Sequence, residues 1–114
     1  VETGALMGVK LEDGTRLWQT TKPVNNLDRR SRHGTAFIIK HEDRFFLANE
    51  AGDLIIAELN PAGYQELSRA HLIEPTNEMA GRKVVWSHPA FANRRVYLRN
   101  DEEIICVDLA REGF

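Results

Sequence analysis

The sequence predicts an all-β protein built from antiparallel strands. Short apolar, β-branched and aromatic runs recur along the chain, and polar or glycine-containing breaks separate most of them. The pattern also repeats with a period of about 50 residues. The expected strand runs are Thr35–Ile39, Phe45–Ala48, Leu54–Leu59, Val84–Trp86, Val96–Leu98 and Ile104–Leu109. We therefore expect β-hairpins rather than long helices.

Composition agrees with a folded domain and excludes several classes of partner. Of 114 residues, 42% are hydrophobic and 28% charged, which argues against wholesale disorder. The net charge of −2 gives no electrostatic reason to expect nucleic acid or an anionic membrane as partner. No run approaches the roughly 18 apolar residues of a membrane span. The single cysteine, Cys106, excludes an internal disulfide and a multi-cysteine metal site.

Two strand runs are apolar at consecutive positions, namely Leu54–Ala57 and Ile104–Val107. Because strict alternation would mean one wet face, we expect both strands to be covered on both faces. The segment Tyr64–Ile73 is ambiguous between an irregular outer strand and a short helix, and we favour the strand slightly.

Self-similarity then suggests the architecture. The segment Arg44–Asn49 aligns with Arg95–Asn100, and Leu54–Leu59 aligns with Ile104–Leu109. Further correspondences join Thr35-Ala36-Phe37 to Pro89-Ala90-Phe91, a partial copy at Leu6–Gly14, and the turn glycines Gly14, Gly63 and Gly113. About 50 residues holding four strands is the size of a β-propeller blade. The alternative is chance likeness among the hairpins of a sandwich or barrel.

The repeats resemble a known family. Leu6–Trp18 is similar to the end of a pyrroloquinoline-quinone-like (PQQ-like) repeat, and Trp86–Phe91 with Arg95–Arg99 is similar to its beginning. The resemblance spans nearly the whole chain and is strongest to bacterial quinoprotein alcohol dehydrogenase-like proteins, including polyvinyl-alcohol-dehydrogenase-like ones. The propeller lipoprotein of outer-membrane barrel assembly shares this repeat. Asp13, Ala62 and Glu112 depart from it, standing where the family has threonine before the turn glycine.

The resemblance implies a partial propeller of about two blades plus extra strands. Residues 1–32 would hold the last strands of one blade and a connection, and 33–73 a complete four-strand blade. Residues 74–86 would be a connecting loop, and 87–114 the first three strands of the next blade. We expect the C-terminal segment of a longer periplasmic or secreted protein. Its partners would be the remaining blades, with self-association through exposed strand edges.

Candidate site residues follow from the same resemblance. A planar tricarboxylate quinone needs cations, an aromatic platform and oxygen ligands for calcium. Residues of suitable chemistry for the quinone are Arg32, His33, Trp86, His88 and Arg99, and those for calcium are Glu50 and Asn100. Each also has a structural explanation, since loop asparagines favour turns and tryptophans favour cores. No catalytic residue can be named.

Two functions from different classes remain open. In the first, the parent protein is a PQQ-dependent alcohol dehydrogenase that uses calcium, and this segment is inactive and cofactor-free when isolated. In the second, the propeller is a non-catalytic scaffold for protein–protein interaction or outer-membrane protein assembly. Fold alone does not decide between them.

Overall fold

The computed structural model describes residues 4–25, 34–79 and 81–110. It contains eleven strands and one short helix, α1 (Lys22–Asn25), within that part of the chain. The strands are β1 (Leu6–Val9), β2 (Arg16–Thr20), β3 (Ala36–His41), β4 (Arg44–Asn49), β5 (Asp53–Asn60), β6 (Gly63–His71), β7 (Asn77–Met79), β8 (Arg82–Val84), β9 (Ala90–Ala92), β10 (Arg95–Arg99) and β11 (Ile104–Asp108).

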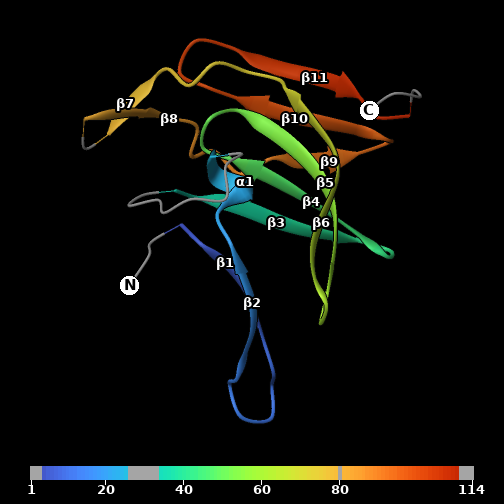
Figure 1. The fold of residues 1–114 in the computed structure, drawn as a ribbon. Helices are drawn as coiled ribbons and strands as arrows, with labels where there is room; N and C mark the ends of the chain where they lie inside the picture. Colours follow the sequence, from blue (N-terminus) through green and yellow to red (C-terminus); the bar gives the residue numbers. More distant parts are fainter. Residues whose placement is uncertain (1–3, 26–33, 80, 111–114) are drawn as a thin grey trace.

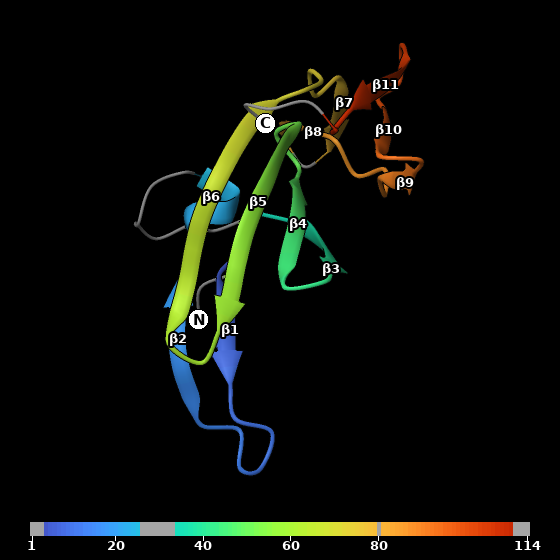
Figure 2. The same ribbon diagram turned by 90° about the vertical axis from the view of Figure 1, so that its right-hand side faces the viewer.

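All strand pairs are antiparallel, and each strand pairs with its neighbour in sequence. They form the hairpin β1-β2, the four-stranded meander β3-β4-β5-β6, the hairpin β7-β8 and the three-stranded sheet β9-β10-β11. The prediction of an antiparallel all-β protein is therefore confirmed. The described strands do not close into a barrel or a propeller (Figures 1 and 2).

The four-stranded sheet lies between two other sheets. One face contributes Ala48 and Leu54 to a core completed by Val96 and Leu98 of the three-stranded sheet. The opposite face carries Leu47, Ile55 and Ala57, against which Leu6 of β1 packs. The tip of the β1-β2 hairpin extends away from the rest of the molecule (Figures 1 and 2).

The consecutive apolar run of β5 is covered on both faces of the sheet, as expected, since Leu54 faces one core and Ile55 the other. The same expectation for β11 is wrong. Ile104 is 73% exposed and Cys106 is exposed, whereas Ile105 and Val107 pack on the core. The reason is that the described residues cover the three-stranded sheet on one face only.

Strand β6 settles the ambiguous segment in favour of a strand, because it pairs with β5 along its whole length. A register shift between Ile56 and Ala57 makes it irregular, as expected. The segments that connect the sheets contain more secondary structure than the sequence predicted. The segment 74–86, expected to be a loop, contains β7-β8, and α1 follows β2.

The pairing register of the strands gives a direct test of the sequence repeat. Leu47 pairs with Ile55 as Leu98 pairs with Ile105, which confirms that alignment of β4-β5 with β10-β11. The alignment of residues 35–37 with 89–91 is wrong by three positions. Val96 corresponds to Phe45 in the confirmed alignment, and its partner on the preceding strand is Phe91, whereas the partner of Phe45 is Lys40. Phe91 therefore corresponds to Lys40 and not to Phe37. Because β9 has three residues and β3 has six, aligning Phe91 with Phe37 by residue type alone shifted the register.

Candidate functional site

Several predicted site residues come together where β10 meets β11. Trp86, Arg99 and Asn100 line one hollow of ≈ 130 Å³. Glu50, from the turn after β4, joins them because its Oε2 accepts a 2.8 Å hydrogen bond from Trp86 Nε1. Arg32 and His33 lie outside the described residues. The hollow is smaller than the about 300–1,000 Å³ of typical small-molecule sites.

His88 has separate contacts. Its Nδ1 lies 2.8 Å from the carbonyl oxygen of Pro89, and its ring centroid is 4.8 Å from that of Phe37. These contacts place the imidazole beside the first strand of the four-stranded sheet. A role for His88 in binding a cofactor stays a prediction.

Glu50 already has cationic and neutral donors. Arg82 donates to it from Nε at 3.3 Å and from Nη2 at 3.2 Å, in addition to the tryptophan bond. The guanidinium carbon of Arg82 also lies 5.6 Å from the centroid of the Trp86 ring. This carboxylate therefore joins β8 to the turn after β4 and orients the indole. A calcium ion at Glu50 would have to compete with these donors and with the positive charge of Arg82.

Asn100 is buried, and both polar atoms of its side chain are hydrogen-bonded. Its Oδ1 accepts 2.8 Å hydrogen bonds from the backbone amides of Glu102 and Glu103, and its Nδ2 donates to the carbonyl oxygen of Glu74 at 2.9 Å. Two amides use the two lone pairs of the side-chain oxygen. The observed role of Asn100 is thus to shape the β10-β11 turn and to hold the connection from β6.

No group of three or more His, Cys, Asp or Glu side chains capable of holding a metal ion occurs in the described part of the chain. Nor is any helix among those residues long and apolar enough to cross a membrane.

Sequence reasoning missed a polar network on β5 and β6. Arg69 donates from Nη1 to Asp53 at 3.2 Å and from Nη2 to Glu66 at 2.9 Å. The same Nη2 donates to the carbonyl oxygen of Lys22 at 2.7 Å, which ties α1 to the sheet. Glu66 and Arg69 meet because the β6 register shift adds a residue between them, which brings positions three apart onto one face. Alternation alone would have placed them on opposite faces.

The network changes several ionisation equilibria, among them those of Glu66, Tyr64 and His71. Hydrogen bonds from Arg69 hold the pKa of Glu66 below its usual value, despite partial burial. Burial, and then the hydrogen bond to Glu66, raise the pKa of Tyr64. Hydrogen bonds to Asp53 and then to Glu74 raise the pKa of His71, whose Nδ1 and Nε2 lie 2.8 and 2.7 Å from these carboxylates. The arrangement is an ion-pair cluster that stabilises the charged forms of Glu66 and His71 and disfavours the phenolate of Tyr64.

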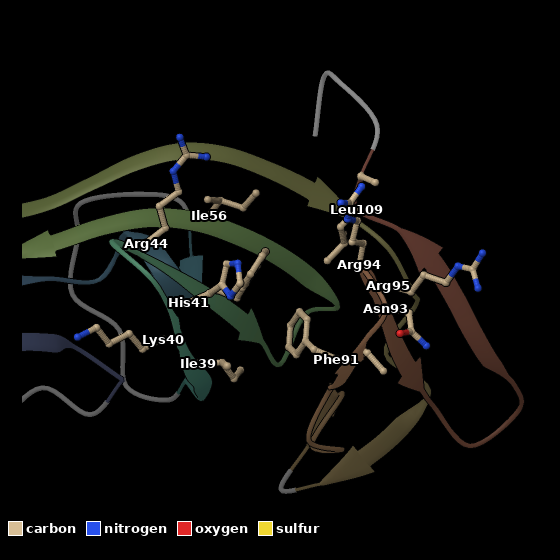
Figure 3. A pocket seen from close by; sticks show the side chains of 13 residues that line it. Ile39, Lys40, His41, Arg44, Ile56, Phe91, Asn93, Arg94, Arg95 and Leu109 are labelled. Carbon is tan, nitrogen blue, oxygen red and sulfur yellow. The ribbon is translucent and has the colours of Figure 1, made fainter.

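A second hollow, of ≈ 670 Å³, lies at the opposite ends of β4 and β10. It opens between the four-stranded and three-stranded sheets, beside the β3-β4 and β9-β10 turns (Figure 3). None of the predicted site residues lines it. A signal was present in the sequence as basic residues beside both turns, namely Lys40, Arg44, Arg94 and Arg95.

Comparison of the chain with protein-family models, with curated proteins and with solved structures gives no match. The fold and the site therefore define a class only at the level of an antiparallel all-β protein with stacked sheets.

Proposed function

We propose that the chain supplies successive blades of a β-propeller of the PQQ-like repeat class and acts as a non-catalytic scaffold. The observation that carries the scaffold role is the state of the two candidate calcium ligands. Glu50 is held by Arg82 and Trp86, and both acceptor sites of Asn100 are used by its own turn. The partners would be further blades and another protein, with outer-membrane protein assembly as one such setting; the periplasmic or secreted location rests on the resemblance alone.

Three features support the propeller. Antiparallel units follow one another in chain order, and the middle unit packs with a different face against each neighbour. Trp18 of β2 donates from Nε1 to the carbonyl oxygen of Asn60 at 2.8 Å, which links one unit to the next. The exposed face of β11, with Ile104 and Cys106, is where a further blade would pack.

A second candidate is the quinoprotein alcohol dehydrogenase. It is favoured by the gathering of Trp86, Arg99 and Asn100 around one hollow, which places an aromatic ring and a cation together. Here the parent protein would bind PQQ and calcium, and the isolated segment would be inactive because most of a ring-shaped site would be missing.

Titration of the full-length parent protein with PQQ, with and without calcium, separates the two, because the isolated segment would be cofactor-free under either candidate. We expect no saturable change in tryptophan fluorescence at micromolar quinone. Saturable, calcium-dependent quenching that disappears in Trp86→Phe but persists in Trp18→Phe would favour the quinoprotein instead.

The angle between successive sheets tests whether they are blades of a propeller. Residual dipolar couplings measured by NMR give the relative orientation of β3-β6 and β9-β11 in solution. Successive blades of a ring of 4–8 should differ by a rotation of about 45–90° about one axis. Parallel stacking without rotation would refute the propeller and leave a sandwich.

A further inference from the structure

The hollow between the two larger sheets has an aromatic floor. The rings of Phe46 and Phe91 lie there with centroids 4.9 Å apart, one from each sheet. The other apolar residues that line the hollow are Ile39, Ile56, Ala92, Leu109 and Ala110. In Figure 3, Phe91 and His41 face the space between the sheets. A hollow of ≈ 670 Å³ is within the range of small-molecule sites.

Its rim is basic. Lys40, Arg44, Arg94 and Arg95 line it, and no Asp or Glu side chain does. Four cations at one opening contrast with the net charge of −2 for the whole chain. Within the described residues, none of the four takes part in an ion pair.

Three carboxylates of the described residues lie near this rim in the sequence or in the sheet register. Glu42 and Asp43 occupy the β3-β4 turn, and Asp108 is the Cα partner of Arg95 in the sheet register. Asp108 accepts a 2.8 Å hydrogen bond from the backbone amide of Ala110. None of the three forms an ion pair with the rim cations.

We propose that this hollow binds a small organic anion, a flat apolar molecule bearing a carboxylate. The two phenylalanine rings would contact its apolar body, and arginine would pair with its carboxylate through two parallel hydrogen bonds. The site lies at the end of β4 and β10 away from Asn49 and Asn100, so it is separate from the Trp86 hollow and independent of the proposed scaffold role.

We expect binding to need rotation of side chains rather than movement of the backbone. In Figure 3, Lys40, Arg44 and Arg95 extend outward from the rim. Exposed side chains change rotamer on the picosecond to nanosecond timescale, and such changes are common at interfaces on binding. Because the backbone of both turns is already in place, an anion would draw these charged ends over the opening.

The test is an NMR titration of ¹⁵N-labelled chain with 2-naphthoate and with its neutral analogue 2-naphthamide. We expect naphthoate to shift the amide signals of Asn93, Arg94 and His41, and to bind about tenfold more tightly than the amide. Added salt should weaken the binding of naphthoate only.

Matched variants locate the interaction. Arg44→Gln and Arg95→Gln should each weaken naphthoate binding several-fold without changing that of naphthamide, while Arg16→Gln on the distant β2 should change neither. Spectra of the variants without ligand verify that they fold. Three outcomes would each overturn the proposal. They are equal affinity for naphthoate and naphthamide, chemical-shift changes located away from the hollow, and arginine variants that bind naphthoate as Arg16→Gln does.

Discussion

Asn49 and Asn100 make corresponding hydrogen bonds in successive sheets. Each side-chain oxygen accepts from two backbone amides that follow it closely in the chain, those of Ala51 and Asp53 for Asn49 and those of Glu102 and Glu103 for Asn100. Each Nδ2 donates at 2.9 Å to the carbonyl oxygen of the residue 26 positions earlier, Pro23 or Glu74. Both side chains are buried, so the contact joins each sheet to the connection that precedes it.

This relationship predicts a shared stability role. Asn49→Ala and Asn100→Ala should each lower the free energy of unfolding by about 1–3 kcal/mol, because backbone groups would be left buried without partners. The exposed Asn60, whose Oδ1 accepts from the Ala62 amide, is the control, with an expected loss of about 1 kcal/mol or less. Urea unfolding measures all three. Equal losses at Asn49 and Asn60 would contradict this role.

Gly52 should tolerate no side chain. Its φ is +93°, and a Cβ atom there would collide with the carbonyl oxygen of Ile73. Gly14 has φ +75° with open space around it. We expect Gly14→Ala to cost about 1–2 kcal/mol from backbone strain alone, and Gly52→Ala to cost more because overpacking adds about 1–3 kcal/mol. Thermal unfolding compares the two, and similar melting temperatures would refute the collision.

His71 should make stability depend on pH. Its pKa is raised above 6.5 by Asp53 and then by Glu74, so the charged form is favoured in the folded state. The stabilisation is complete below the unfolded value of about 6.5 and is lost as pH rises through the raised pKa. The side chain is 47% exposed, so solvent screening keeps the effect below about 1 kcal/mol.

An NMR titration of the His71 ring gives its pKa, and Glu74→Gln should lower that pKa. The variant His71→Gln should lose this pH dependence of the unfolding free energy over the same window. An unchanged slope in His71→Gln would show that another group is responsible.

Self-association through the open sheet is the last prediction. Ile104 is 73% exposed on β11, which pairs only with β10 among the described strands. Sedimentation over a range of concentrations should show association, and Ile104→Lys should weaken it about tenfold, because a charge replaces the apolar contact. Glu102→Gln changes the charge by the same amount in the neighbouring turn. If both variants behave alike, the strand surface is not the interface.

The sequence alone predicted most strands and their pairing order. Alternating and continuous apolar runs are local properties, so β4, β5 and β10 could be read from the residue types. The correspondence between Asn49 and Asn100 was also visible in the sequence, although it indicated only that both are turn residues. Neither observation required knowledge of what packs on each sheet.

Other features depended on tertiary contacts. Whether a continuous apolar run is buried on both faces depends on neighbouring sheets, which is why the prediction held for Leu54–Ala57 and failed for Ile104–Val107. The partners of Glu50 and the cluster of Arg69 also join residues distant in sequence.

What the sequence by itself determined is therefore the class of element and the repeat, because backbone preference and side-chain alternation act between near neighbours. The tertiary structure decided which polar atoms are already bonded and where the basic hollow lies. These properties arise only when separate turns, such as those ending at Arg44 and Arg95, are brought to the same end of two packed sheets.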